Sequence, residues 1–361
     1  MGEERSELLE IIALTREFAL AELRPHSEQW DHAGAVDEGT MTQLAELGFL
    51  GMLAPESAGG MGMDRTSMLS AVEQLAWGEA STGMAVALHA QVVALLARHG
   101  SEGARQWLPA LAAGELIGCA QAATDENTTV QALPSDGGWL LRGSLPWVGN
   151  VRPAGLLALL AAADAGPLLC LIPVSSPGIE LRPPVATMGL RPLALRTLTL
   201  HDVTVAEQSV LSGPALPAAE RAAGAADAAL YVAAVAVGIG QAALEHARDY
   251  ANVREQFGCK LREFEGIQHK LADMAVRVAA ARALLYRAAS DPGAAEAALA
   301  KVAAAEAAMY ASTQAVQIFG GYGYMRDYPV EKLMRDAKAM SLLGGADELH
   351  RVRIAERLYS E

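Results

Sequence analysis

Five positions in the C-terminal third of the chain could hold a ligand that combines an anionic group with a planar ring. Arg254 carries a permanent charge, and its guanidinium can make paired hydrogen bonds to a pyrophosphate. Phe257 offers an apolar face to a flat ring. Gln317 presents both a donor and an acceptor. Gly320 and Gly321 follow a predicted helix, where missing side chains let backbone amides approach a ligand closely.

Each of these features also occurs in proteins without such a ligand. An Arg and a Phe three residues apart on a helix are most often a surface ion-pair residue and a core residue. A Gly-Gly pair is most often a turn. Only the combination of these features, at this spacing over a long stretch of sequence, favours a binding site.

The patterns around these positions predict three structural regions. Residues 1–116 show helical periodicity and predict an N-terminal α-helical domain. Residues 117–212 contain short apolar runs separated by Gly and Pro, which predict a β domain. Residues 213–361 return to long Ala-rich helical patterns, which favour a four-helix bundle that provides most of the contact between subunits. We therefore expect an α+β fold that is mostly α.

Within the last region the periodicity predicts helices at 222–253, 268–290, 294–319 and about 347–358. No strand is expected between residues 222 and 319. The apolar run 228–240 is too short to span a bilayer and is interrupted by Gly238 and Gly240, so we expect a buried helix there.

Composition narrows the function classes. The chain has 28 basic and 42 acidic residues, a formal charge of -14, which argues against a nucleic-acid or anionic-membrane surface. A small molecule or another protein is the expected partner. Cys119, Cys170 and Cys259 are scattered without disulfide or metal-ligand spacing, so we expect no metal site. The acidic N-terminal segment lacks the features of an export signal, and we expect a cytoplasmic protein.

Two segments of the C-terminal region carry a family resemblance. Residues 250–258 read YANVREQFG, and residues 317–324 read QIFGGYGY, followed by YPVEK at 328–332 and RDAK at 335–338. At this spacing, and over nearly the whole chain, the sequence resembles the acyl-CoA dehydrogenase family. The family fold adds to the expectation above a middle domain that is a β-barrel or sandwich.

The resemblance implies a cofactor, a substrate class and partners. In the family, the residues that match Arg254, Phe257, Gln317, Gly320 and Gly321 contact the dinucleotide part of FAD carried mainly by a neighbouring subunit. We therefore expect an oligomer, a dimer of dimers with identical or different subunits. The expected substrate is an acyl-CoA or acyl-carrier thioester that undergoes α,β-dehydrogenation, with an electron-transfer flavoprotein or a similar protein as acceptor.

The middle domain departs from the family pattern where the flavin ring should bind. A family loop that begins Thr-Glu-Pro and ends Gly-Ser-Asp reads TDENTT at 124–129, so only Thr124 is kept. The family segment Trp-Ile-Thr-Asn reads WVGN at 147–150, which keeps the aromatic ring of Trp147 and loses a hydroxyl. Thr124 and Trp147 are the remaining candidates for flavin contact, although Trp147 also fits a half-buried sheet residue.

The family's catalytic base is missing. The Glu that normally removes the α-proton aligns with Gly344, and the alternative family position aligns with Ala228. The nearest carboxylates in sequence are Asp227, Asp347 and Glu348. Asp227 would need a register change, because one residue turns a helical side chain by about 100°. For Asp347 and Glu348 a helix-capping or solvated role is the simpler interpretation.

Three functional hypotheses remain open from the sequence. The chain is an acyl-CoA dehydrogenase-type enzyme or a subunit of one. Alternatively, it is a non-catalytic partner that completes the FAD site of a catalytic sister chain, as the well-matched dinucleotide residues and the eroded flavin-ring residues suggest. A third hypothesis is a family member repurposed for other flavin chemistry on a carrier-bound intermediate.

Overall fold

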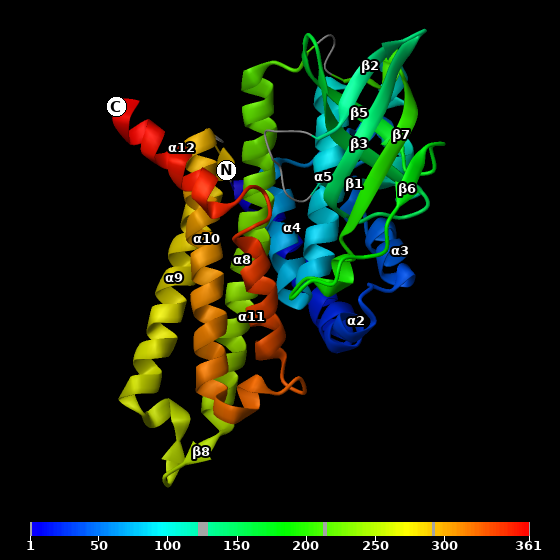
Figure 1. Ribbon diagram of the computed structural model, residues 1–361. Helices are drawn as coiled ribbons and strands as arrows, with labels where there is room; N and C mark the ends of the chain where they lie inside the picture. The colour runs from blue at the N-terminus through cyan, green and yellow to red at the C-terminus, as the bar shows by residue number, and fades with distance from the viewer. Residues whose placement is uncertain (1, 122–128, 212–214, 291–292, 361) are drawn as a thin grey trace.

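The computed structural model describes residues 2–121, 129–211, 215–290 and 293–360. The chain has a helical N-terminal region, a sheet region in the middle and a helical C-terminal region (Figure 1). The predicted fold class is therefore confirmed.

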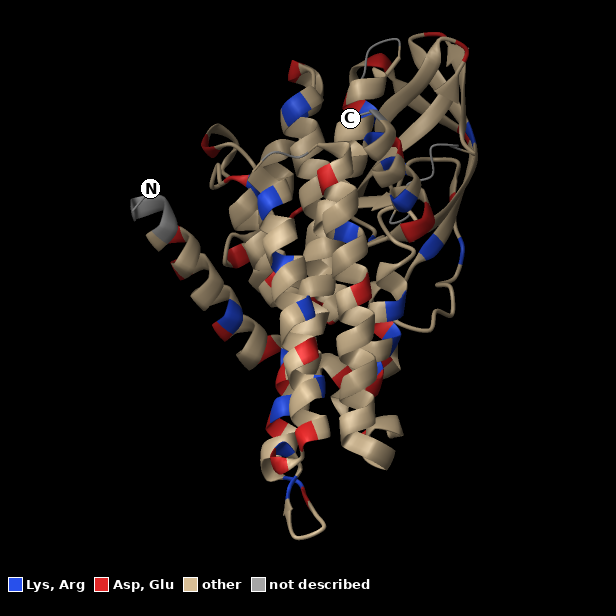
Figure 2. Cartoon of the chain, turned by 90° about the vertical axis from the view of Figure 1, so that its left-hand side faces the viewer, with Lys and Arg blue, Asp and Glu red and all other residues tan. Residues whose placement is uncertain are grey.

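Two long helices form the centre of the N-terminal region. They are α4 (Arg65–Gly78) and α5 (Ala80–His99), and most of their residues are buried. Local sequence sets where each begins, because Asp64 accepts a hydrogen bond from the Ser67 amide and Glu79 accepts one from the Thr82 amide. The other elements surround this pair: α1 (Gly2–Phe18), a π-helical turn η1 (Ala19–Leu23), η2 (Arg24–His26), α2 (Ser27–Ala33), α3 (Glu38–Glu46), η3 (Phe49–Gly51), η4 (Glu56–Ala58), α6 (Glu102–Arg105) and α7 (Leu108–Ala112). Helix α1 projects from the body of the molecule (Figure 2).

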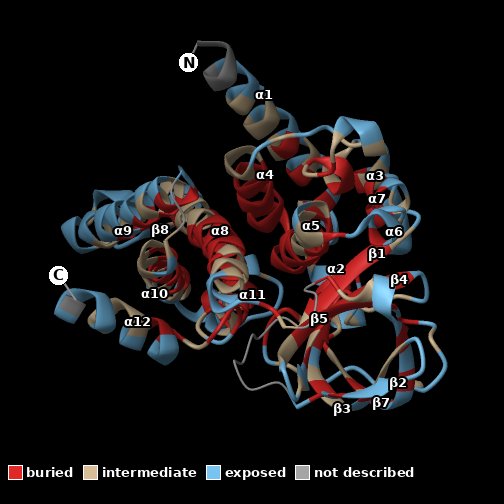
Figure 3. Cartoon of the chain, turned by 90° about the horizontal axis from the view of Figure 1, so that it is seen from above, coloured by how far each residue is buried: buried red, intermediate tan, exposed pale blue. Residues whose placement is uncertain are grey.

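The middle region is a seven-stranded sheet. Its strands are β1 (Ile117–Gln121), β2 (Gln131–Ser135), β3 (Gly138–Gly149), β4 (Gly155–Ala163), β5 (Gly166–Pro173), β6 (Ile179–Leu181) and β7 (Arg196–Ala206). The order is β1-β4-β2-β3-β7-β6, with β5 on β4, and an additional pairing of β1 with β3 curls the sheet around its own core. Figure 3 shows these strands as a ring around a buried interior, in agreement with the expected barrel.

The C-terminal region is a helical bundle built around α8 (Ala218–Val253). Helices α9 (Glu265–Ser290), α10 (Ala294–Phe319) and α11 (Pro329–Met340) complete it, and α12 (Asp347–Ser360) packs on α10. Small residues allow the helices to approach closely. A Cβ on Gly238 would lie only 2.4 Å from the carbonyl oxygen of Glu73, so this glycine is needed where α8 crosses α4.

Two details differ from the sequence-based expectation. The patterns did not predict α11, which packs against α8 and α10 as the fourth helix of the bundle. In addition, the short strands β8 (Glu255–Gln256) and β9 (Cys259–Lys260) form a hairpin between α8 and α9, where no strand was expected. The Gly at 258, with a φ of +85°, supplies the left-handed conformation that such a tight turn requires.

Two helices, α5 and α8, are long and apolar enough to cross a membrane by length and composition alone. Most of each lies buried inside the fold, 78% and 72% of the most apolar window respectively, as the core helices of a soluble protein also would. The run 228–240 is part of α8 and is buried, as predicted. Figure 2 shows acidic and basic residues interspersed along the bundle helices.

Candidate functional site

The β8–β9 hairpin presents Arg254 and Phe257 at one end of the bundle. Arg254 caps the C-terminus of α8, and its carbonyl accepts a hydrogen bond of 2.9 Å from the Leu261 amide, which closes the hairpin. Phe257 lies at the turn in a left-handed conformation with a φ of +54°. Its side chain is 95% exposed, which is unusual for a large apolar residue and marks a contact surface.

Arg254 is available to an anionic ligand. Its guanidinium carbon lies 5.4 Å from the ring centre of Tyr322, in the turn η8 (Gly320–Tyr324) that follows α10. Among the residues that the structure describes, no carboxylate lies within 4 Å of this guanidinium. The charge is therefore held in place by an aromatic ring and is not neutralised by the chain itself.

The glycines of η8 show that another molecule can approach here. Gly320 has a φ of +61° and a ψ of -135°, a conformation that only glycine adopts readily. Gly321 has an ordinary φ, and a Cβ built on it would meet no atom within 4 Å. Nothing within the described chain thus requires glycine at 321. Gln317 is exposed on the last turn of α10, next to these glycines.

Stacked aromatic rings hold the two halves of this surface together. Tyr250 on α8 and Phe319 at the end of α10 stack with their ring centres 4.0 Å apart. The structure therefore brings Arg254 and the Gly320-Gly321 pair to the same end of the bundle, which is the arrangement that a shared ligand would need. We refer to Arg254, Phe257, Gln317, Gly320 and Gly321 as the bundle-tip residues.

The residues expected at the flavin ring lie elsewhere. Thr124 falls outside the described residues. Trp147 belongs to β3, and the sheet and the β8–β9 hairpin lie at opposite ends of the molecule (Figures 1 and 2). Trp147 has a φ of +62° at an irregularity in the β3–β7 pairing, and its side chain is 39% exposed. One chain therefore does not bring its two sets of candidate residues together, which is the geometry expected when each site uses two chains.

Gly149, where the family resemblance leads us to expect a threonine, packs closely against α5. A Cβ on Gly149 would lie 2.6 Å from Cδ1 of Leu88 on α5, so a threonine does not fit there without rearrangement. Asn150, the next residue, is buried and donates hydrogen bonds to the carbonyls of Ala85 and Gly118. Gly149 therefore packs on α5, and Asn150, just after β3, forms hydrogen bonds to both α5 and β1.

Gly344 and Ala228, which the family resemblance leads us to expect at the positions of the catalytic Glu, meet in space. Gly344 lies in the turn between α11 and α12, and a Cβ on it would lie 3.1 Å from the carbonyl oxygen of Ala228 on α8. It would also lie 2.9 Å from Cγ2 of Val232. Neither Gly344 nor Ala228 has a side chain that can accept a proton.

The nearby carboxylates are engaged in ion pairs. Asp227 pairs with Arg65 at 2.9 Å and with Arg98 at 3.2 Å, which ties α8 to α4 and α5. Asp347 accepts a 2.6 Å hydrogen bond from Nζ of the fully buried Lys301. Burial raises the pKa of Asp347, and it lowers the pKa of Lys301. Glu348 is largely exposed and lies 3.7 Å from Arg351.

Two residues that the sequence did not single out shape the turn at Gly344. Lys301 also donates a 2.8 Å hydrogen bond to the carbonyl of Gly345. His350 Nε2 lies 2.9 Å from the carbonyl of Gly344, so it carries the proton, and its buried Nδ1 has no partner. Desolvation lowers the pKa of His350 to about 4. A Lys within an Ala-rich helical pattern was the available sequence signal for a buried polar contact.

The segments that read YPVEK at 328–332 and RDAK at 335–338 form buried ion pairs that join the three regions. Lys332 lies between the buried carboxylates of Glu79 and Asp336, at 2.8 and 2.7 Å, and Asp336 also accepts a hydrogen bond from the Leu190 amide. These two carboxylates raise the pKa of Lys332 although burial opposes them. Arg335 pairs with Asp31 of α2. These residues therefore fix the relative position of the regions.

Comparisons with known proteins agree with this architecture. Residues 5–115 match the acyl-CoA dehydrogenase N-terminal domain, and residues 223–359 match the C-terminal domain. The chain is 34% identical to a probable acyl-CoA dehydrogenase, YngJ, of Bacillus subtilis, over 96% of both chains. It is 32% identical to the mitochondrial short-chain specific acyl-CoA dehydrogenase of Bos taurus, over 95% of this chain and 88% of that one.

Solved structures give the same result. Butyryl-CoA dehydrogenase from Megasphaera elsdenii superposes with a TM-score of 0.90 at 30% identity, over 98% of both chains. The prolyl acyl carrier protein oxidase AnaB superposes with a TM-score of 0.88 at 25% identity, over 98% of this chain and 99% of that one. This chain belongs to the acyl-CoA dehydrogenase family, whose members depend on FAD.

Proposed function

We propose that this chain is a subunit of an FAD-dependent acyl-thioester dehydrogenase, in which its bundle-tip residues complete the FAD site of an adjoining subunit. The observation that carries the proposal is Arg254, which lies beside Tyr322 without a carboxylate partner in the described part of the chain. Gly321 supports it, because a Cβ there would meet no atom of the described chain and the backbone is therefore open to an approaching molecule.

Each bundle-tip residue has a role that its chemistry fits. Arg254 binds the pyrophosphate through charge-assisted hydrogen bonds. Phe257 covers an apolar part of the cofactor, and the backbone of Gly320 and Gly321 approaches it closely. Gln317 supplies a donor and an acceptor. Bound FAD would supply the hydride-accepting chemistry that no protein side chain provides.

The Gly344–Ala228 contact favours a second candidate function. Removal of an α-proton from a thioester needs a positioned base, which commonly contributes about 10²- to 10⁴-fold in rate. The place where the family's two base positions converge holds no carboxylate in this chain. The candidate is therefore a non-catalytic subunit that pairs with a sister chain carrying the Glu.

The similarity to a prolyl acyl carrier protein oxidase at 25% identity favours a third candidate. In this case the chain would use its flavin to oxidise or reduce an intermediate bound to a carrier protein. In each case an electron-transfer flavoprotein or a similar acceptor would reoxidise the cofactor.

Flavin stoichiometry separates these candidates. The chain is purified alone and after co-expression with a family member that retains the Glu, and FAD per chain, assembly mass and turnover with acyl-CoA and acyl-carrier thioesters are measured. A flavin-loaded homo-oligomer with acyl-CoA turnover supports an independent enzyme, and turnover with carrier-bound substrates alone supports the third candidate. FAD that is retained only in the mixed assembly supports the partner subunit. Absence of FAD from both preparations would overturn the proposal.

Gly321→Ala tests the bundle-tip site directly. The added methyl group meets no atom of the described chain, so we expect unchanged thermal stability and weaker FAD retention. Gly224→Ala on α8 is the matched control, because its Cβ also meets nothing within 4 Å and it lies away from the bundle tip. Equal FAD retention by both variants would contradict an approach of the cofactor at Gly321.

A further inference from the structure

The sheet meets the helical core at Gly118 of β1, and side chains from two other elements bind both backbone polar groups of this residue. The Gly118 amide donates a 2.9 Å hydrogen bond to Nδ1 of His89 on α5, and its carbonyl accepts a 3.0 Å hydrogen bond from the Asn150 side chain. Figures 1 and 3 show β1 beside α5 at this junction. A Cβ on Gly118 would lie 2.8 Å from Cβ of Val92, so the strand approaches the helix as closely as glycine allows. We refer to His89, Gly118 and Asn150 as the junction clamp.

His89 is fully buried, and its two ring nitrogens have different partners. Nδ1 accepts the hydrogen bond from the Gly118 amide, so the ring proton is on Nε2. Nε2 lies 3.1 Å from the carbonyl oxygen of Leu50 in η3 and donates to it. Burial lowers the pKa of His89 to about 4, so the ring is neutral at neutral pH. One nitrogen therefore joins α5 to β1, and the other joins α5 to η3.

The junction clamp holds a strained segment that carries Trp147. Strand β1 pairs with residues 148–149 at the end of β3. On either side of this pair, Trp147 and Asn150 each have a φ of +62°, a conformation that is unfavourable for residues other than glycine. Such a conformation persists only where the surrounding structure fixes it. The Asn150 side chain does so, because it also donates a hydrogen bond to the carbonyl of Ala85 on α5.

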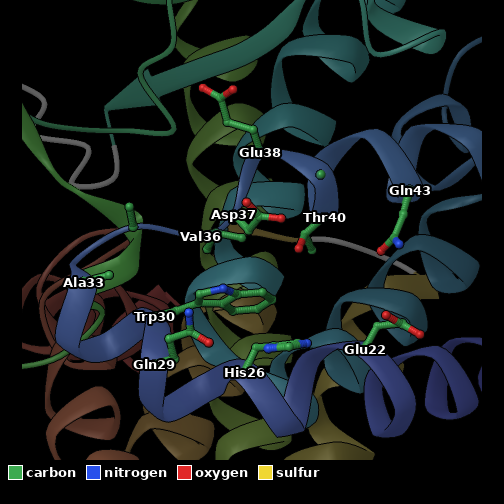
Figure 4. Close-up of a pocket in the computed structure, with 12 residues that line it drawn as sticks. Glu22, His26, Gln29, Trp30, Ala33, Val36, Asp37, Glu38, Thr40 and Gln43 are labelled. Atoms are coloured by element: carbon green, nitrogen blue, oxygen red, sulfur yellow. The ribbon is translucent and has the colours of Figure 1, made fainter.

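The strained segment presents the only exposed tryptophan of the chain. The Trp147 side chain is 39% exposed. Trp77 is buried, and Trp30 lies in the wall of a hollow beside α2 with only 5% exposed (Figure 4). Trp107 and Trp139 are half-buried. An aromatic face that a strained backbone keeps in contact with solvent is a surface for a planar ligand.

We propose that the junction clamp, and His89 in particular, positions the Trp147 segment for the flavin ring. His89 is a positioning residue: it is fully buried and acts on the ring through the Gly118 amide and strand β1. This inference rests on the proposed function, because it takes Trp147 as a contact of the flavin. The hydrogen bond from the same imidazole to Leu50 holds η3 and does not reach the sheet.

Two substitutions separate the two ring nitrogens of His89. The side-chain oxygen of Asn replaces Nδ1, so His89→Asn keeps an acceptor for the Gly118 amide and loses the contact with Leu50. The side-chain amide of Gln replaces Nε2, so His89→Gln keeps a donor for Leu50 and leaves the Gly118 amide without an acceptor. Each variant loses one buried hydrogen bond, so we expect similar losses of thermal stability.

Only His89→Gln should weaken FAD binding, by about tenfold in flavin release on dilution. Hydrogen–deuterium exchange of the full chain without added FAD gives a second readout. Exchange at 117–121 and 147–150 should rise in His89→Gln and stay at the parent level in His89→Asn. His246→Gln is the matched control, because His246 is a partly buried imidazole on α8 that contacts Arg24 and lies away from the sheet. It should change neither FAD release nor exchange in these strands.

Equal FAD release from His89→Gln and His89→Asn would overturn this inference and leave the proposed function standing, because the imidazole would then only stabilise the fold. A parent chain that binds no FAD, alone or in a mixed assembly, would overturn both. If neither His89 variant folds, Asn150→Gly decides. Glycine accepts the left-handed backbone at this position, and the variant removes the side chain that holds Gly118. FAD release from Asn150→Gly at the parent rate would overturn the inference, and release about tenfold faster would support it.

Discussion

Gly344 and Ala228 lie against each other, with a Cβ on Gly344 placed 3.1 Å from the carbonyl oxygen of Ala228. They come from the turn after α11 and from the long helix α8, and they are more than 100 residues apart in sequence. A carboxylate introduced at either position would therefore enter the same small region. The chain carries none at either one.

Gly344→Glu is expected to restore some dehydrogenation of acyl-CoA if the flavin ring and the thioester bind this chain. The change has a structural cost, because Gly344 has a φ of +65° and its new Cβ would press on Val232. A left-handed non-glycine residue costs about 1–2 kcal/mol. Gly344→Ala is the control, since it carries the same strain without a carboxylate. Turnover with an artificial acceptor is compared at equal FAD content, and turnover by the parent chain itself would refute the view that the base is missing.

Arg254→Ala should lower FAD affinity without destabilising the fold. Hydrogen bonds to a charged group contribute about 1.5–3 kcal/mol each, so the loss of one predicts at least tenfold faster or more extensive flavin release. Stability should not change, because Arg254 makes no ion pair within the described chain. Flavin release on dilution is measured by fluorescence. Arg248→Ala on the same helix, where Arg248 is exposed and paired with Asp249, should retain FAD like the parent. Identical release from both variants would make Arg254 an ordinary surface residue.

Lys332→Met should destabilise the protein strongly. The change leaves the buried carboxylates of Glu79 and Asp336 without their cation, and breaking a buried ion pair in this way costs about 3–5 kcal/mol. Denaturant unfolding followed by circular dichroism measures the loss. Lys338→Met on the exposed side of α11 is the control and should change stability little. A small effect at Lys332 would mean that the two carboxylates take up protons and tolerate the loss.

His350 should make stability fall as the pH is lowered. Burial lowers its pKa from about 6.5 to about 4, so between these values the unfolded chain binds a proton that the folded chain does not. Stability from this residue is therefore complete above about pH 6.5 and is lost as the pH falls toward 4, by up to about 3 kcal/mol. Urea unfolding at several pH values should show a shallower decline for His350→Gln than for the parent. His32→Gln, at an exposed position, should follow the parent curve.

Local sequence patterns determined most of the secondary structure. The 3.6-residue repeat of apolar side chains in α8, α9 and α10 and the Gly- and Pro-separated runs of the middle region are properties of neighbouring residues, so they can be read without the fold. The helix α11 was missed because its sequence was used only for the family resemblance, and its many charged residues give no simple apolar face. Several of them, including Lys332, Arg335 and Asp336, are instead buried in ion pairs. Burial of charge is a tertiary property that periodicity does not report.

For the candidate site, too, the sequence indicated some features and only the tertiary structure revealed others. The types of Arg254, Gln317 and the Gly320-Gly321 pair were compatible with an anionic ligand, and the family resemblance implied a dinucleotide. The structure brings Arg254 and the turn after α10 to one end of the bundle. The sequence also showed that Gly344 and Ala228 lack a carboxylate. Only the tertiary structure places these two residues in contact, engages Asp227 and Asp347 in ion pairs, and separates Trp147 from the bundle tip. The reason is physical: a side chain's chemistry and its helical repeat are local, whereas its partner depends on how distant helices and strands pack.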